Sequence, residues 1–219
     1  MISTFLKEIK DNIKFRIKLF LLISLVFNFG YAIFLFAVSQ AYFSKWFFVM
    51  SIYYALLSIA RIFIFFEINQ KKSLREKILA MRVCGYFLLL LNLVVSVMVF
   101  LLIYTAPYAK YHEIIVITLA TYTFSALTIA IVNIVRYLKK NDHVYSCVKV
   151  ISLISASVSM LTLTNTMLAT FGSDNELLRS IILPLLSGFV AIFIIVCAIL
   201  MIRKANLDLR ILENGKERK

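Results

Sequence analysis

Six long blocks of apolar residues follow one another along the chain, separated by short polar stretches. They lie near residues 19–41, 46–68, 83–105, 113–136, 147–170 and 177–202. Each block is long enough for an α-helix, rising about 1.5 Å per residue, to cross about 30 Å of hydrocarbon. The pattern therefore predicts an all-α, polytopic membrane protein whose six transmembrane helices form three hairpins.

The chain on either side of these blocks has a different pattern. Apolar and basic positions alternate at helical spacing over residues 1–18, which predicts a basic amphipathic helix on the membrane surface. A simple basic flank is the alternative for its first residues. Residues 19–203 are expected to form one six-helix transmembrane domain and residues 204–219 a basic cytoplasmic tail, because the connections are too short to hold a soluble domain.

Basic residues are concentrated on one side of the predicted spans. The chain has 24 Lys and Arg against 11 Asp and Glu, a net charge of +13. Five basic residues precede the first block, five separate the second from the third, four lie between the fourth and fifth, and six follow the last. The opposite side has only Lys45, Lys110 and Arg179. Since cytoplasmic loops carry the excess of Lys and Arg, a cell-membrane protein with both termini in the cytoplasm is expected.

The same charge distribution bears on partners. Basic residues at one membrane surface are expected to contact the lipid bilayer and its anionic lipids, and nucleic acid is not an expected partner. A homo-oligomer or a membrane partner remains open.

Polar and small residues fall on one face of each predicted helix. Over residues 147–170, for example, six Ser and Thr residues lie within about 80° of arc on a helical wheel. Lipid tails cannot satisfy these groups, so the faces should point inward, either as packing surfaces or as a polar path between helices. The candidate path residues are Asn28, Tyr54, Ser58, Arg61, Asn92, Ser159, Thr162, Asn165, Thr166, Pro184 and Ser187.

Arg61 is the one charged residue well inside a predicted span, about 9 Å from its cytoplasmic end. From this depth the side chain can extend along the helix to the interface. Alternatively, it belongs to a buried or functional polar network, which would offset the cost of an Arg in the membrane.

The outer halves of the last two spans combine several polar groups. Asn165 and Thr166 lie at about the depth of Pro184 and Ser187, and Pro184 leaves the carbonyl of Ser180 without its helical partner. These groups could serve a neutral or weakly cationic solute, or they could bond to one another.

Signatures of covalent or metal chemistry are missing from the sequence. It has no HExxH, nucleophile elbow, Walker loop or CxxC motif, and its two histidines lie on opposite sides of the predicted membrane. Its three cysteines fit small apolar packing positions. We therefore expect no enzyme activity, no cofactor and no metal site.

The first hairpin, from Asn28 through Ser44 to Tyr53 and Leu57, resembles the first two helices of cation diffusion facilitators. That family also has six spans and cytoplasmic ends, so the resemblance implies the same topology. Its metal ligands stand four residues apart on the second helix, where this chain has Tyr53 and Leu57, so metal transport does not carry over. More generally, the chain resembles uncharacterised six-helix bacterial membrane proteins, a likeness that implies no function.

Two functional hypotheses follow. The first is a small transporter-like or channel-like protein with a polar path between helices and an unknown substrate. The second is a non-transporting accessory, immunity or regulatory subunit that binds a partner through its helix faces. A continuous water-accessible cavity would favour the first, and a tightly filled bundle with an exposed small-residue groove the second.

Overall fold

The computed structural model describes residues 13–69, 73–104, 111–137, 143–171 and 176–217, and these are almost entirely helical. The helices are α2 (Ile13–Tyr42), α3 (Lys45–Asn69), α4 (Leu74–Tyr104), α5 (Glu113–Tyr137), α6 (His143–Phe171) and α7 (Glu176–Glu217). Each of the six contains a stretch long and apolar enough to cross a membrane. The predicted all-α class with six spans is confirmed.

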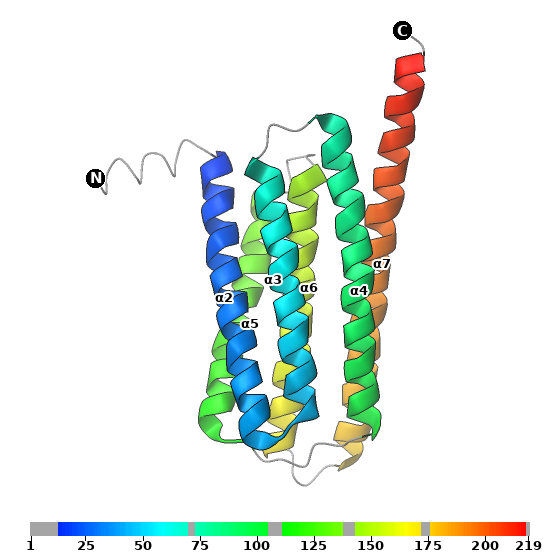
Figure 1. Ribbon diagram of the computed structural model, residues 1–219. Coiled ribbons are helices and arrows are strands. Elements are labelled where there is room, and N and C mark those ends of the chain that lie inside the picture. Colours follow the sequence, from blue (N-terminus) through cyan, green and yellow to red (C-terminus); the bar gives the residue numbers. More distant parts are fainter. Residues whose placement is uncertain (1–12, 70–72, 105–110, 138–142, 172–175, 218–219) are drawn as a thin grey trace, which may run out of the picture.

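The helices run roughly parallel to one another, and some of them pair with helices that are not their neighbours along the chain (Figure 1). The most extensive pairings are α4 with α7, α2 with α3, and α5 with α6, and α3 and α4 also pack on α6. Of the apolar, membrane-spanning stretch of each helix, 56% is buried inside the bundle in α3 and 61% in α6, against 28% in α7. Helices α3 and α6 are therefore central, whereas α2 and α5 lie at the outside.

Local signals define where several helices begin and end. Ser73 and Glu76 form a reciprocal capping box at the start of α4, with the two bonds at 3.3 and 3.4 Å. At the turn between α2 and α3, Phe43 has a left-handed φ of 48° and the Ser44 N–H donates to the Ser39 carbonyl at 3.1 Å. This is a Schellman-type ending with Phe in the place usually taken by Gly, and it makes the first turn tight.

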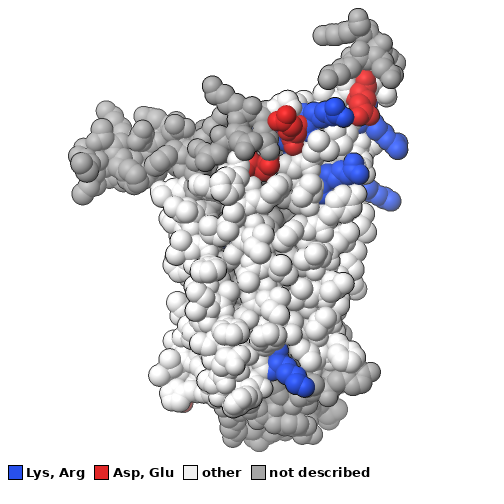
Figure 2. Space-filling view, viewed as in Figure 1, with Lys and Arg blue, Asp and Glu red and all other residues white. Residues whose placement is uncertain are grey.

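The two ends of the bundle differ in chemistry. The charged end, where α4 and α6 begin and α7 ends, carries Arg75, Lys77, Arg82, Lys149, Arg203 and Lys204. Figure 2 shows Lys and Arg side chains together with Asp and Glu side chains at one end, above a broad uncharged band, and a basic side chain at the other end. The aromatic end is formed by Tyr42, Phe43, Trp46, Phe47 and Tyr111, with the Phe47 and Tyr111 ring centroids 4.9 Å apart.

Helix α7 is the longest element and packs closely on α4. At Gly85 an added Cβ would lie 2.6 Å from Ile202 Cγ1 and 3.4 Å from the Ala198 carbonyl oxygen, so Gly allows the two helices to approach. Beyond this contact, α7 continues to Glu217 and includes most of the segment expected to form a tail. His143 Nδ1 of α6 lies 3.5 Å from Asp208 Oδ2 and ties α6 to this extension. Residues 1–12 of the expected surface helix lie outside the described residues.

Candidate functional site

Most hydroxyl groups in the predicted polar stripes are satisfied by their own helix. In α5, Thr118, Thr121, Ser125 and Thr128 each donate to the carbonyl four residues earlier, at 2.8–2.9 Å. The same bonding occurs in α6 for Thr162 and Thr166, both at 2.9 Å. A hydroxyl that donates to its own backbone needs no ligand. In α6, Thr162 and Thr166 are buried, so that stripe faces inward as expected. In α5, Thr121 and Thr128 are exposed, so the expectation that its polar face points inward is wrong, and bonds to its own backbone satisfy its hydroxyls.

Unpaired polar groups instead gather between α2, α3, α5 and α6, about halfway along the bundle. We call this group the tyrosine–arginine cluster; its members are Asn28, Tyr31, Tyr53, Tyr54, Arg61, Tyr122 and Ser155. All seven side chains are buried. The buried polar atoms without a hydrogen-bond partner include Asn28 Nδ2, Arg61 Nε, Ser155 Oγ and the hydroxyl oxygens of Tyr31, Tyr53 and Tyr54.

The tyrosine rings hold the cluster together. Tyr31 and Tyr122 stack face to face with ring centroids 3.5 Å apart and an angle of 1° between planes. Tyr54 meets the edges of this pair, with centroids 4.7 Å from Tyr31 and 5.4 Å from Tyr122. The Tyr122 hydroxyl donates to Asn28 Oδ1 at 2.5 Å and thereby links α5 to α2. The aromatic contacts fix the positions of three helices around one polar centre.

Arg61 lies at the charged-end side of the tyrosines. Its side chain is only 4% exposed, and it is close enough to Tyr122, Tyr53 and Tyr54 to interact with them electrostatically. Side chains in an α-helix lean toward its amino terminus, which for α3 means away from the charged end and toward the tyrosines. Of the two alternatives for Arg61, a buried position therefore fits the structure better than extension to the interface.

Every unpaired group of the cluster can donate a hydrogen bond: Asn28 Nδ2 and Arg61 Nε only donate, whereas the Ser and Tyr hydroxyls can donate or accept. The amide oxygen of Asn28 is already used by Tyr122, which leaves the Nδ2 donor, and Arg61 has donors only. Among the described residues, no carboxylate pairs with Arg61. A buried positive charge surrounded by free donors is complementary to a ligand that is negatively charged and only accepts.

A groove on the outside of the bundle borders this cluster. It lies between α2 and α5, has a volume of about 490 Å³, and is lined by Val26, Phe27, Gly30, Tyr31, Phe34, Ile117, Thr118, Thr121, Tyr122 and Ser125. Val26, Phe27 and Ile117 are exposed on the lipid-facing surface, whereas Tyr31 and Tyr122 are buried. The stacked tyrosine pair is therefore both a wall of the groove and a part of the cluster.

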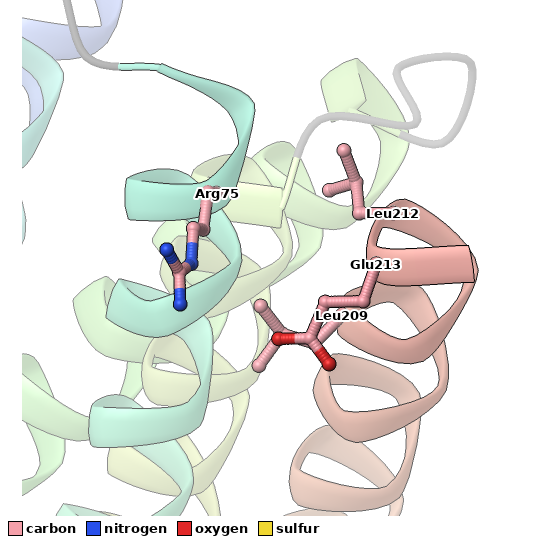
Figure 3. A pocket seen from close by; sticks show the side chains of 4 residues that line it. All are labelled: Arg75, Leu209, Leu212 and Glu213. Carbon is pink, nitrogen blue, oxygen red and sulfur yellow. The ribbon is translucent and has the colours of Figure 1, made fainter. Parts of the chain in front are cut away.

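A second pocket lies at the charged end and is much smaller, about 90 Å³. Arg75 of α4 and Leu209, Leu212 and Glu213 of α7 line it (Figure 3). Its volume is below the range of about 300–1,000 Å³ that is usual for small-molecule sites. Neither of these two pockets runs through the described part of the bundle from one end to the other.

The predicted path residues divide into two groups. Asn28, Tyr54 and Arg61 belong to the cluster, and Ser159 lies beside Tyr54. Ser58 donates to the Tyr54 carbonyl at 2.8 Å, while Asn92 on α4 is buried with Oδ1 unpaired. The remaining residues on α6 and α7 lie elsewhere: Thr162, Asn165, Thr166, Pro184 and Ser187.

These α6 and α7 residues have their own local surroundings. Thr162 also approaches Met50 Sδ at 3.3 Å, and Ser187 donates to the Pro184 carbonyl at 3.0 Å. Asn165 is fully buried with both amide atoms unpaired, and it lines neither of the two pockets in the described part of the chain. Pro184 is partly exposed.

Sequence reasoning missed four cluster members, Tyr31, Tyr53, Tyr122 and Ser155, as site residues. A signal was present, since membrane tyrosines usually lie at the interfaces, where the ring is apolar and the hydroxyl can reach water. These three tyrosines lie near the middle of their helices instead. A tyrosine at that depth needs an internal partner.

The chain matches no protein-family model and no curated protein. Among the described residues there is also no group of three or more His, Cys, Asp and Glu that could hold a metal ion.

Proposed function

We propose that this protein is a transporter-like membrane protein that takes a negatively charged, lipid-soluble molecule from the bilayer into the tyrosine–arginine cluster. The observation that carries the proposal is the Tyr31–Tyr122 pair, which borders the α2–α5 groove on one side and the buried donors on the other. Binding needs no covalent chemistry and no metal. The positive charge of Arg61 disfavours a cationic solute. The polar groups of α6 and α7 had suggested a neutral or weakly cationic one.

A second candidate function is supported by the shape of the same groove. Gly30 lines it, and a Cβ added there would meet no atom within 4 Å. Small residues on an exposed face allow another helix to approach closely, so the groove could hold a transmembrane helix of a partner. In that case the protein would be an accessory or regulatory subunit, and the cluster would serve only to hold α2 and α5 in place.

Chemical labelling of the cluster separates the two functions. In a cysteine-free background, Ser155→Cys should react with the bilayer-soluble reagent benzyl methanethiosulfonate at least tenfold faster than Thr162→Cys. Both positions are buried on α6, but only Ser155 lies beside Tyr122 and therefore close to the groove. Equal and slow reaction of both cysteines would show that the cluster is closed to the bilayer.

A matched pair of glycines tests whether the groove is the route. Gly30→Leu should slow the labelling of Ser155→Cys at least tenfold, because the new side chain fills the groove. Gly188→Leu is the control: an added Cβ at Gly188 of α7 also meets nothing within 4 Å, but Gly188 does not line the groove. Neither variant should unfold the protein, since Leu has the higher helix propensity. A similar effect of both variants would contradict entry between α2 and α5.

We also propose that the charged end faces the cytoplasm of a cell-membrane protein and contacts anionic lipids there. The support is the excess of Lys and Arg at this end, together with six spans, an even number, which place both termini on one side. In intact cells, Ser73→Cys should resist an impermeant thiol reagent and His112→Cys should react. Both side chains are exposed at turns, at opposite ends of the bundle. The reverse pattern of reaction would overturn this orientation.

A further inference from the structure

The chemistry of the cluster and of the groove together narrows the ligand. We propose that it is an ionised long-chain carboxylic acid whose carboxylate binds Arg61 and whose chain lies in the α2–α5 groove. This inference rests on the proposed function, since it names the class of molecule that enters the same site.

The carboxylate follows from the donors that the fold leaves free. Arg61 carries a planar fork of N–H groups that matches the two oxygens of a carboxylate. The neighbouring buried donors are Asn28 Nδ2, which has no partner, and Ser155 Oγ and the Tyr54 hydroxyl, which lie beside Tyr122. A carboxylate accepts up to about four hydrogen bonds and donates none, so it can use these groups without leaving an unmatched donor of its own.

The long alkyl chain of the proposed ligand is inferred from the surface of the α2–α5 groove. The groove opens on the face of the bundle that lipid covers, and Val26, Phe27, Phe34 and Ile117 contribute four of its ten lining residues. The hydroxyls of Thr118, Thr121 and Ser125 in this lining donate to their own helix, so they present no free donor to the groove. A wholly hydrophilic anion gains nothing from such a surface, whereas an alkyl chain does.

The narrow passage selects a small head group. To reach Arg61 from the groove, the acid must pass the wall made by Tyr31 and Tyr122, whose rings are stacked at a centroid distance of 3.5 Å. Aromatic pairs favour offset or edge-to-face arrangements, so this face-to-face pair is not the arrangement that resists separation most. A carboxylate is the smaller head group and requires less separation of the two rings than the branched head group of a two-chain phospholipid.

Fluorescence quenching by a brominated acid tests the inference in lipid vesicles. Trp46 is the one tryptophan of the chain, and its buried Nε1 has no partner, so Trp46→Phe provides a background without fluorescence from Trp. Phe27→Trp then reports on the groove and Phe189→Trp on the lipid-facing surface of α7, because both phenylalanines are exposed but only Phe27 lines the groove. Vesicles of dioleoylphosphatidylcholine receive increasing amounts of brominated stearic acid at neutral pH.

We expect quenching at Phe27→Trp to saturate, whereas quenching at Phe189→Trp should rise in proportion to the acid in the membrane. The methyl ester of the same acid should give only the proportional component at both positions. Arg61→Met should weaken the saturable component at least tenfold, and Arg61→Lys less, because Lys keeps the charge without the fork. Gly30→Leu should remove the saturable component, whereas Gly188→Leu should leave it unchanged. The glycine variants therefore test the inference even if the Arg61 variants fail to fold.

Three results would overturn the inference. Saturable quenching by the methyl ester would show that the groove recognises only an apolar chain. Saturable quenching by brominated phosphatidylcholine would identify a phospholipid as the occupant. Proportional quenching by the acid at Phe27→Trp would show no binding. If that occurs while Ser155→Cys is still labelled through the groove, only the ligand class is wrong; if the labelling fails as well, the proposed function falls with it.

Discussion

Arg61→Met should raise the free energy of unfolding of the ligand-free protein by about 1–4 kcal/mol. The guanidinium is buried at 4% exposure, its Nε has no partner, and no carboxylate among the described residues pairs with it. A buried charge without a counter-charge is costly, and an apolar side chain of similar length removes that cost. Denaturation in mixed detergent micelles, followed by circular dichroism, measures the change.

Ile64→Met is the control for this substitution. Ile64 is 1% exposed and lies one turn along α3, and the exchange conserves volume, so a loss below about 1.5 kcal/mol is expected there. Brominated stearic acid should stabilise the wild-type protein but not Arg61→Met, because only a bound ligand shifts the unfolding equilibrium. If Arg61→Met instead lowers the stability by more than the control, Arg61 is a structural residue held by the tyrosines and not a vacant ligand partner.

Tyr54→Ala should lower the free energy of unfolding by about 3–5 kcal/mol, the range for deleting a buried aromatic ring. The Tyr54 side chain is fully buried and contacts Tyr31, Tyr53 and Tyr122. Tyr54→Phe keeps all of these ring contacts and removes only the hydroxyl, which lies beside Ser159 and Tyr122, so it should cost no more than about 1 kcal/mol. Thermal unfolding of the two variants in the same detergent gives the comparison.

The two Tyr54 variants also separate packing from binding. Tyr54→Phe should weaken the saturable quenching by the brominated acid, because the carboxylate loses a donor while the fold remains intact. A large loss of stability in Tyr54→Phe would mean that the hydroxyl has a structural partner, and it would remove Tyr54 from the group of free donors.

The hydroxyl stripe of α6 shows that a sequence pattern can identify the buried face of a helix without showing which group each hydroxyl bonds. The wheel placed Ser and Thr of α6 on one face, and Ser152, Ser155, Ser159, Thr162 and Thr166 are indeed buried. A Ser or Thr in a helix can, however, donate to its own backbone, and the pattern of residues does not reveal that choice. Only coordinates distinguish a satisfied hydroxyl such as Thr166 from an unsatisfied one such as Ser155.

The sequence by itself determined the six helices, because membrane-spanning segments are set by the local requirement that about 20 apolar residues cover the hydrocarbon. It also located Asn28, Tyr54 and Arg61 as polar groups inside spans. The partners of each helix were decided by tertiary structure, since α5 packs on α6 and α4 on α7 through shape and small residues such as Gly85. The tyrosine–arginine cluster depends on those pairings: Asn28 and Tyr122 are 94 positions apart in sequence, and no local pattern predicts their hydrogen bond. Helix packing in lipid relies on contacts between distant residues, so the site became visible only after the helices were assembled.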